Sequence, residues 1–491
     1  MQYIGIDLGS TNIKAAVYDH GFRRLAEESE PVQYERSGVF VELDAELFVE
    51  KLFEMLKRLL LKQGVNAWEI QGLGLTGQAE TLVILDKGDN PLMNAISWMD
   101  ERSKDECREL EKRFADGAYK KVTGQQAVLP TWPATKILWL RKNRPEIYGR
   151  AACYMLLKDY VCFRLTGRKA ADCSIATFSF YFDIYRKRYW KEMLEAIGVR
   201  EEQLPPLTEP CRELGGLTEE AAEKTGLSRS VRVNAGTLDH FAGMIGTGNV
   251  EPGGMSLSTG TVMALAVPVS DVDGGRESGL AMHYGFLPDT YVLLPVAESG
   301  GVSLEWFLKT CMPGMDYEKL NHELEKRPRP NGLIFLPYLV GTNAPEFDED
   351  ACGLFYGLRA GSDAYDMAAA VMEGVAFLLR KSCDAIRASG TELCRITAAG
   401  GGARSAVWCQ MQADITGIPV DIPREKEAAC LGAAMIAAAG EGADAEKYKG
   451  LAALGNGTEK SYVPREPERY ERKYRQFCRL YQSMLETARL P

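Results

Sequence analysis

The chain has 491 residues, 46% of them hydrophobic, and its 58 basic against 68 acidic side chains give a formal net charge of −10. This length predicts at least two domains with a sizeable buried core, and the acidic balance argues against a nucleic-acid-binding protein, which would need a basic face. The sequence contains no run of 18 apolar residues and begins without a signal peptide, so we expect a cytoplasmic protein with no membrane anchor.

Strand-like and helix-like segments alternate along the chain, which is typical of an α/β protein. Residues 3–8 and 13–18 are predicted to form two paired strands joined by the turn Gly9-Ser10-Thr11-Asn12. Apolar positions at helical spacing predict a helix over 45–62, and residues 70–76 are predicted to form the next strand.

A similar strand–turn–strand layout recurs in the second half, where the sequence from residue 255 reads MSLSTGTVMALAV. Each copy opens about half of the chain, which favours two similar lobes facing a cleft. The glycine-rich segment 247–254 breaks both helix and strand. We therefore expect one domain over residues 1–249 and a second over residues 250–491, with a solvated helix near the end at 470–485.

The turn in the first half places glycine, hydroxyl and amide residues between Asp7 and Lys14 (DLGSTNIK). Several N–H groups and side-chain donors converge there, which suits a phosphate group, because hydrogen bonds to charged oxygens are short and strong. Asp7 ends a predicted buried strand, where a carboxylate is costly unless it meets a cation or donors. The alternative is a plain hairpin turn in which Asp7 accepts hydrogen bonds from local amides.

The second half carries a comparable turn, Thr259-Gly260-Thr261, and the pair of turns favours phosphate binding more than either turn alone. Glycines at 400–402, followed by Arg404 and a helix-like segment, would let the backbone approach a flat ligand such as adenine. A loop that needs positive φ angles is the alternative there. Small residues over 427–434 predict a closely packed helix, either beside a nucleotide or simply within the core.

A predicted strand at 231–233 leads through a glycine turn to Asp239, with His240 next, at the start of a predicted helix. A carboxylate in this position could accept the proton of an attacking hydroxyl, and an N-capping aspartate is the alternative. The sequence contains no GxxxxGK[ST] loop and none of the protein-kinase HRD or DFG motifs. Its 12 cysteines form no CxxC pair and its four histidines are scattered, which argues against a metal held by protein ligands alone. Two phosphate turns without a Walker lysine favour the actin-like ATPase superfamily.

Taken in order, these motifs resemble the FGGY family of carbohydrate kinases. The resemblance runs through IGIDLGSTNIKAAVYD, TGQAETLVILD, AISWMDERS, LLKDYVCFRLTG and AGTLDHFAGMIGTG in the first half. It continues through LSTGT, GLIFLPYLVGTNAPEFDEDACGLFYGL, AAGGGARSAVWCQMQADITGIPV and EKEAACLGAAMIAA, and covers roughly residues 1–440. Residues 353–373 fit the family's C-terminal signature, and residues 131–139 fit the N-terminal one except at its first position, Thr131.

The resemblance implies two ribonuclease-H-like domains of the actin-like ATPase superfamily that flank a deep cleft, and phosphate transfer from ATP to a sugar or polyol. It implies that Asp239 is the catalytic base and that Asp7 and Asp239 hold Mg²⁺ through water. The residues expected to bind ATP are Asp7, Gly9, Ser10, Thr11, Asn12, Lys14, Thr259, Gly260, Thr261, Gly401, Gly402 and Arg404. The residues expected to bind the sugar are Gln78, Ala79, Glu80, Trp98, Asp239 and His240.

The residues expected to face the sugar depart from the well-known branches of the family. Glycerol kinases resemble this chain at Glu80 and Trp98, but carry Arg at the position of Ala79 and Gln at that of His240. Xylulokinases typically read Gln-Met-His-Gly where this chain reads Gln-Ala-Glu-Thr over 78–81. We therefore expect a neutral pentulose such as xylulose, or a glycerol- or erythritol-like polyol, because Glu80 would repel a sugar acid. The alternatives are an actin-like scaffold ATPase or a sugar sensor without kinase activity. The oligomeric state is open, with a homodimer as one possibility.

Overall fold

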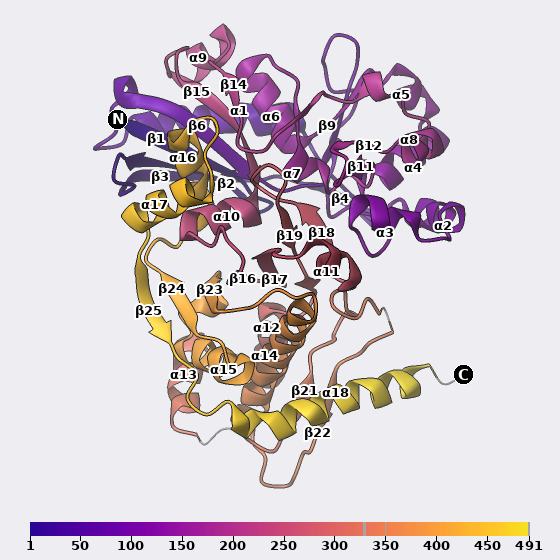
Figure 1. Ribbon diagram of the computed structural model, residues 1–491, viewed down its shortest axis with the longest axis vertical. Helices are drawn as coiled ribbons and strands as arrows, with labels where there is room; N and C mark the ends of the chain where they lie inside the picture. Colours follow the sequence, from indigo (N-terminus) through magenta and orange to yellow (C-terminus); the bar gives the residue numbers. More distant parts are fainter. Residues whose placement is uncertain (328–329, 349, 490–491) are drawn as a thin grey trace. The chain divides into compact units, whose positions relative to one another are not determined.

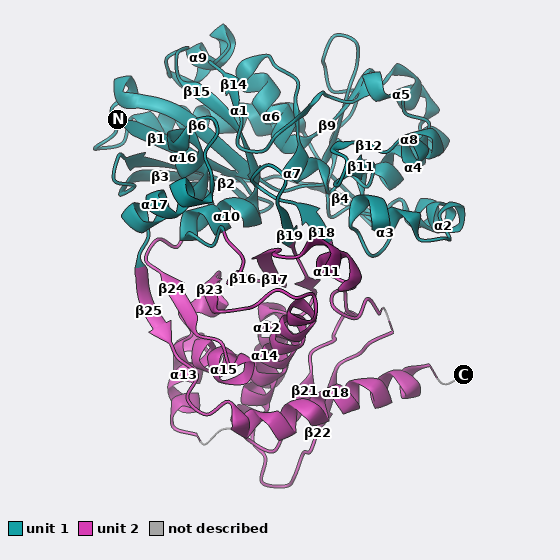
Figure 2. Ribbon diagram, in the orientation of Figure 1, with its two compact units in different colours: residues 1–250, 282–292, 427–457 teal, residues 251–281, 293–426, 458–491 magenta. Residues whose placement is uncertain are grey.

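The computed structural model describes residues 1–327, 330–348 and 350–489, which form two compact units (Figure 2). The first unit contains residues 1–250, 282–292 and 427–457, and the second contains residues 251–281, 293–426 and the chain from 458 onward. The longest segment of the first unit therefore ends close to the domain border expected at residue 249. The first unit also contains two segments from the second half of the chain. The physical reason is close packing: the small residues of 428–439 lie against the sheet of the first unit.

The main sheet of the first unit has six strands in the order β14-β15-β6-β1-β2-β3, labelled in Figure 1. Strands β1, β6 and β15 run parallel to one another, whereas β2, β3 and β14 pair with their neighbours in the antiparallel sense. The predicted strand pair at 3–8 and 13–18 is confirmed, since Asp7 lies opposite Lys14 in the β1–β2 register. The six strands are β1 (Gln2–Leu8), β2 (Asn12–Asp19), β3 (Arg24–Pro31), β6 (Ile70–Gly77), β14 (Glu213–Gly215) and β15 (Arg232–Leu238).

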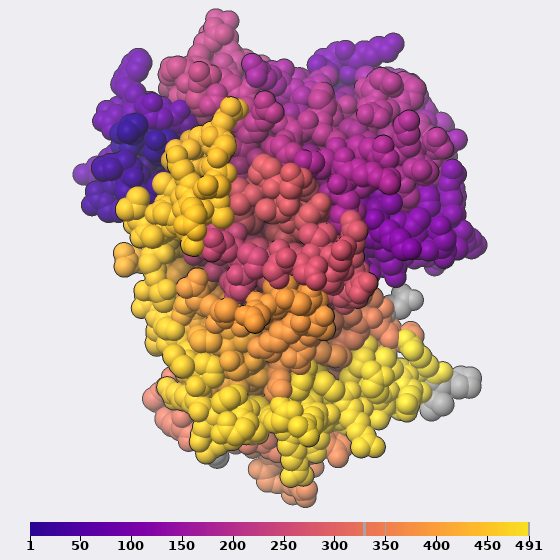
Figure 3. All heavy atoms as spheres, viewed as in Figure 1, coloured from indigo at the N-terminus to yellow at the C-terminus, as the bar shows by residue number. Residues whose placement is uncertain are grey.

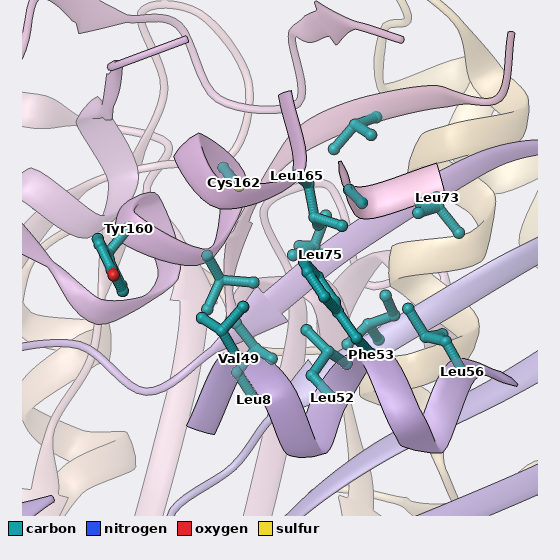
Figure 4. Packing of buried hydrophobic residues seen from close by; sticks show 14 of the residues in the cluster. Leu8, Val49, Leu52, Phe53, Leu56, Leu73, Leu75, Tyr160, Cys162 and Leu165 are labelled. Atoms are coloured by element: carbon teal, nitrogen blue, oxygen red, sulfur yellow. The ribbon is translucent and has the colours of Figure 1, made fainter. Parts of the chain in front are cut away.

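Helix α1 (Ala45–Leu60) covers one face of this sheet. Its N-terminus is capped by Asp44, whose carboxylate accepts the backbone N–H groups of residues 46 and 47. Figure 4 shows Leu52, Phe53 and Leu56 of this helix packed with residues of β1, β6 and α6. The apolar positions at helical spacing thus form a buried face, as the sequence pattern predicts.

Helix α16 (Ala428–Ala439) covers the opposite face of the sheet. A Cβ added to Gly5 would lie 1.8 Å from the carbonyl oxygen of Cys430, and one added to Gly74 would lie 1.8 Å from that of Ala433. Because side chains alternate across a strand, Ile6 and Leu75, next to these glycines, point to the core beneath α1. The glycines thus let the helix backbone sit directly on the sheet.

A second sheet of the first unit supports the segment expected to face the sugar. Its strands run in the order β4-β5-β8-β7-β9, where β7 follows residues 78–81 and β8 precedes Trp98. Its strands are β4 (Glu35–Ser37), β5 (Phe40–Leu43), β7 (Leu82–Leu85), β8 (Ala95–Ile96) and β9 (Cys153–Leu156). The remaining helices of the first unit are η1 (Ala67–Glu69), α2 (Lys104–Arg113), α3 (Ala118–Thr123), α4 (Pro133–Asn143), α5 (Pro145–Arg150), α6 (Leu157–Thr166), α7 (Cys173–Ala176), α8 (Lys191–Ile197), η2 (Glu201–Gln203), α9 (Glu219–Thr225), α10 (Asp239–Thr247) and α17 (Ala445–Gly455).

Two short strand pairs complete the described strands of residues 1–250. Two further strands follow within residues 282–293. The pairs are β10 (Ala171–Asp172) with β13 (Leu207–Thr208), and β11 (Phe182–Asp183) with β12 (Arg188–Tyr189). The further strands are β18 (Met282–Tyr284) and β19 (Tyr291–Leu293).

The second unit is built on strands in the order β17-β16-β23-β24-β25, with β20 also pairing with β17. Strand β16 lies antiparallel to β17 and parallel to β23, so the ends of β16 and β23 meet at one edge of the sheet. Its strands are β16 (Gly254–Thr259), β17 (Met263–Pro268), β20 (Val296–Ala297), β21 (Ile334–Leu336), β22 (Leu354–Tyr356), β23 (Arg395–Ala399), β24 (Val420–Pro423) and β25 (Thr458–Tyr462). Its helices are α11 (Val272–Glu277), α12 (Gly301–Cys311), α13 (Tyr317–Glu325), α14 (Ala364–Ala388), η3 (Gly402–Arg404), α15 (Ala406–Thr416) and α18 (Glu468–Ala488).

Helix α18 contains the predicted helical segment 470–485 and extends it at both ends. It is amphipathic, and its buried side includes Lys473, whose ammonium group pairs with the buried carboxylate of Glu373 on α14. Its other side forms a band along the surface of the second unit, yellow in Figure 3. None of the helices formed by the described residues has the length and apolarity needed to cross a membrane.

Candidate active site

The turn between β1 and β2 contacts the segment that was expected to face the sugar. The Gln78 amide donates a hydrogen bond to the carbonyl oxygen of Gly9 (3.3 Å), and the Trp98 indole N–H donates one to Ser10 Oγ (2.9 Å). A Cβ on Gly9 would lie 2.7 Å from the carbonyl oxygen of Asn12, so the tight turn requires glycine. The structure thus brings two of the predicted sugar residues, Gln78 and Trp98, into contact with the predicted phosphate turn.

Asp7, near the end of β1, is half-buried, and one of its carboxylate oxygens is fully buried. Its Oδ1 atom has no hydrogen-bond partner among the described residues. Burial, and next the negative charge of Asp239, raise the pKa of Asp7 to about 7, although the ammonium group of Lys14 opposes this shift. A buried carboxylate beside a second carboxylate is the arrangement that a cation stabilises.

Lys14 and Glu427 form an ion pair of 2.6 Å between the first turn and the start of α16. Burial disfavours the charged form of Lys14, but the hydrogen bond and charge of Glu427 outweigh it and raise the pKa of the lysine. Asp7, Lys14, Asp239 and Glu427 therefore interact as one cluster of charges within the first unit.

Asp239 is the first residue of α10 and directly follows strand β15. Its Oδ1 accepts the backbone N–H of His240 at 2.6 Å, and no other hydrogen bond to its carboxylate is formed by the described part of the chain. A second histidine, His283, is buried and interacts electrostatically with His240. Burial and the charge of His240 lower the pKa of His283 to about 3. Among the described residues, neither Asp239 nor His240 hydrogen-bonds to Gln78, Glu80 or Trp98.

Glu80 has a left-handed backbone, with φ at 64°, which is uncommon for a residue other than glycine. Its side chain accepts a hydrogen bond from Thr131 Oγ1 (3.0 Å), and its backbone carbonyl accepts one from the ammonium group of Lys136 (3.0 Å). Lys136 also donates to the carbonyl of Ser97 at 2.8 Å. Burial raises the pKa of Glu80 to about 7, while the charge of Lys136 opposes the shift. Fixed partners on both sides hold this strained residue in one orientation.

In the second unit, the turn after β16 lies against the glycine-rich loop after β23. A Cβ on Gly402 would lie 2.9 Å from Cβ of Thr259, and one on Gly400 would lie 2.8 Å from the carbonyl oxygen of Thr259. Gly400 has φ at 81°, as the sequence alternative of a positive-φ loop requires. Gly260, Thr261, Gly401 and Arg404 are exposed beside this contact. The two motifs of the second half, far apart in the sequence, therefore form one surface.

The sequence matches two family models, "FGGY family of carbohydrate kinases, N-terminal domain" over residues 2–246 and the C-terminal domain of the same family over residues 276–441. The chain is 32% identical over 446 residues to a xylulose kinase of Bacillus subtilis (strain 168), covering 90% of this chain and 89% of that protein. It is 30% identical to a xylulose kinase of Escherichia coli (strain K12), covering 98% and 99%. A solved xyloylose kinase structure from Brucella ovis superposes with a TM-score of 0.92 at 30% identity, covering 99% of both chains.

The chain belongs to the FGGY family of carbohydrate kinases. It is therefore a carbohydrate kinase, which transfers phosphate from ATP to a sugar or polyol, and its α/β units have the actin-like ATPase fold of this family. The expected fold class, family and enzyme class are confirmed. The expected scaffold or sensor alternative finds no support among these relatives.

Three residues of this FGGY kinase were missed by reasoning from the sequence. Glu427 was included only in a closely packed helix, whereas it pairs with Lys14. Thr131 was noted only as a departure from a family signature, and Lys136 only as part of it, whereas both contact Glu80. Each of the three is a charged or polar residue in a motif whose neighbouring residues offer it no partner. This feature could have indicated a partner elsewhere in the chain.

Proposed function

We propose that this FGGY kinase transfers the γ-phosphoryl group of MgATP to a hydroxyl of a neutral ketopentose of the xylulose type, with Asp239 as the general base. In this step the hydroxyl gives its proton to Asp239, its oxygen forms a bond to the γ-phosphorus, and the bond to the β-phosphate oxygen breaks to release ADP. The observation that carries the proposal is the position of Asp239 beside Asp7, with no cap or partner among the described residues apart from the neighbouring backbone N–H.

The unpartnered Oδ1 atom of Asp7 supports a magnesium site at this place. Mg²⁺ in phosphoryl-transfer enzymes is held by one or two carboxylates, with water and phosphate as its other ligands. Asp7 and Asp239 would hold it through water, and a bound ion supplies charge neutralisation for the phosphates. Lys14, fixed by Glu427, keeps a positive charge beside the same turn.

The nucleotide contacts that we propose lie in both units. In the first unit they are Gly9, Ser10, Thr11, Asn12 and Lys14; in the second they are Thr259, Gly260, Thr261, Gly401, Gly402 and Arg404. The tight turns expose backbone N–H groups, which suit phosphate oxygens. The close contact between Thr259 and Gly402 supports a shared role for the second set.

The proposed sugar contacts are Gln78, Ala79, Glu80, Trp98 and His240. Glu80 is held by Thr131 and Lys136, so its carboxylate offers a fixed acceptor to substrate hydroxyl groups. Above its raised pKa of about 7, the same carboxylate would repel the carboxylate of a sugar acid, which favours a neutral substrate. The names of the relatives from Bacillus subtilis and Escherichia coli support a xylulose-type ketose as the first compound to test. The enzyme would act in the cytoplasm, with a homodimer as the assembly to test.

The test measures ADP release with D-xylulose, L-xylulose, xylitol, erythritol, glycerol and gluconate, for the wild type and for Asp239→Asn. We expect turnover of a neutral ketose, and a fall in its kcat of about 10²–10⁴-fold in the variant, because the hydroxyl loses its proton acceptor. ATP binding, measured by calorimetry, should be retained.

Asp444→Asn is the matched control, because Asp444 caps α17 in the same unit and asparagine caps equally well. This control should keep the wild-type kcat. A turnover of Asp239→Asn close to that of the control would contradict the assignment of the base, and gluconate as the best substrate would contradict the neutral-sugar proposal.

A further inference from the structure

A lysine outside the charged cluster is completely buried and contacts the strand that leads to Asp239. Lys158, on α6, has 0% of its side chain exposed. Its ammonium group donates to Asp159 Oδ1 (3.0 Å) and to the backbone carbonyl of Ala235 (2.6 Å), and lies 3.3 Å from Asp172 Oδ2. Figure 4 shows Tyr160, Cys162 and Leu165 of the same helix within the core beneath the main sheet, so the helix is firmly anchored.

Strand β15 contains a bulge where Lys158 contacts it. Asn234 pairs with Gly74 and Thr237 pairs with Thr76, so Ala235 and Gly236 together lie opposite the single residue between them on β6. Gly236 has φ at 69°, and a Cβ there would lie 1.5 Å from the carbonyl oxygen of Leu75. A bulge of this kind takes a residue out of the ladder, and the Ala235 carbonyl finds its partner in Lys158 instead.

The same buried charges hold the strand on the far side of the bulge. Asp172 accepts hydrogen bonds from both the backbone N–H and Oγ of Ser174, each at 2.9 Å. Ser174 Oγ in turn lies 2.7 Å from Thr237 Oγ1, and Thr76 Oγ1 donates to the carbonyl of Thr237. Thr237 is two residues before Asp239, so the chain is fixed immediately before the candidate base.

We propose that Lys158, with Asp172, is a positioning pair for Asp239: it holds the bulge at Ala235 and Gly236 and thereby sets where the Asp239 carboxylate stands at the start of α10. This proposal rests on the proposed role of Asp239. Buried ion pairs add little net stability compared with apolar residues of the same volume, and their best attested role is to specify one arrangement. A bulge next to an active site re-aims a side chain, which is the effect required here.

A test has to remove the charges without leaving one of them unpaired in the core. The triple variant Lys158→Met, Asp159→Asn and Asp172→Asn does this, because methionine matches the aliphatic stem and the amide oxygen introduced at position 172 can still accept from the backbone N–H of Ser174. We expect kcat to fall roughly 10–100-fold, since small misplacements of a reacting group cost this much. The KM values for ATP and sugar should stay close to wild type. The midpoint of thermal unfolding should fall only slightly, because the Ala235 carbonyl loses the donor of Lys158.

The matched control is Lys473→Met with Glu373→Gln, which removes a buried ion pair between α18 and α14 of the second unit, whereas β15 belongs to the first unit. Its kcat should stay within about twofold of wild type. Retention of the full kcat in the triple variant would overturn the proposal. A parallel loss of kcat, of substrate affinity and of the unfolding midpoint would also overturn it, because this pattern indicates a purely structural role.

The dependence on Asp239 is tested by combining the triple variant with Asp239→Asn. If the lysine acts through the base, the combined variant should be no slower than Asp239→Asn alone. Multiplication of the two losses would show that Lys158 acts elsewhere and would overturn the positioning role. Failure of the proposed function is recognised separately, because Asp239→Asn alone would then keep its activity.

Discussion

At the scale of single residues, the carboxylate of Asp7 lowers the stability of the protein when no cation is bound beside it. Its pKa is raised to about 7 by burial and by Asp239. A native state with a raised acid pKa binds a proton more tightly than the unfolded chain does, so stability is lost as the pH rises from about 4 to about 7. Without metal or nucleotide, this residue therefore destabilises the protein at neutral pH.

Asp7→Asn removes this ionisation. At pH 8 we therefore expect the free energy of unfolding of the variant to exceed that of the wild type by about 1–2 kcal/mol. Urea denaturation without ligands measures this difference. At pH 5 the difference should be much smaller, because the Asp7 carboxyl of the folded wild type is then mostly protonated. Asp105→Asn, at an exposed position, is the control and should show no such pH-dependent gain. Equal stability of Asp7→Asn and wild type at pH 8 would show that Asp7 has a partner in solution.

Glu80 is the residue on which discrimination against sugar acids should depend. Glu80→Gln keeps an acceptor for Thr131 but removes the charge. At pH 8, above the raised pKa of Glu80, we expect the ratio of kcat/KM for gluconate to that for the neutral substrate to rise at least about tenfold, because a like-charge contact is relieved. At pH 6, where the Glu80 carboxyl is mostly protonated, the rise should be smaller. Glu101→Gln changes an exposed glutamate on the same chain segment and should leave the ratio unchanged. An unchanged ratio in Glu80→Gln would remove Glu80 from the sugar site.

At the scale of elements, the contact between α10 and α16 places the helix that begins with Asp239. A Cβ on Gly246 of α10 would lie 2.1 Å from the carbonyl oxygen of Ala428, and one on Gly432 of α16 would lie 1.8 Å from that of Ala242. The two helix backbones thus approach each other directly, and α16 also lies on the sheet. The small-residue run of 427–434 is used for this close packing.

Gly246→Ala should destabilise the protein by about 1–3 kcal/mol or more, because the new methyl group overlaps backbone atoms that have no room to move. Gly243→Ala is its matched control on the same helix. A Cβ there meets no atom within 4 Å, so the better helix propensity of alanine should stabilise the protein by about 0.5–1 kcal/mol. Thermal unfolding followed by circular dichroism measures both, and effects of the same sign would contradict the packing argument.

At the scale of the whole molecule, the first unit is assembled from three separate stretches of the chain. A fragment of residues 1–250 lacks α16, so the glycine face of β1 and β6 would be exposed to water. We expect this fragment to bind a hydrophobic dye and to unfold without a cooperative transition. Joining residues 427–457 to it through a flexible linker should restore much of the cooperativity. A sharp unfolding transition of the 1–250 fragment by itself would show that the main segment folds independently.

Local patterns in the sequence determined the parts that carry the chemistry. The strand pair around Gly9, the helix that begins near residue 45 and the strand at 70–76 all lie where they were predicted. Asp239 begins a helix, as expected, but it follows strand β15 directly, and Gly236 lies in a bulge of that strand instead of the expected glycine turn. These features depend on residues close together in the chain, where period, turn residues and the end of an apolar run are visible. The order of the motifs was enough to identify the family.

Only the tertiary structure decided which distant residues meet. The ion pair of Lys14 with Glu427 joins residues 413 positions apart, and Glu80 meets Thr131 across 51 positions. The placement of α16 in the first unit and the hydrogen bond of Lys158 to the bulge of β15 also join residues that are far apart in the chain. None of these contacts has a local signal, because their energy comes from burial and charge pairing that exist only once the chain has brought the partners together.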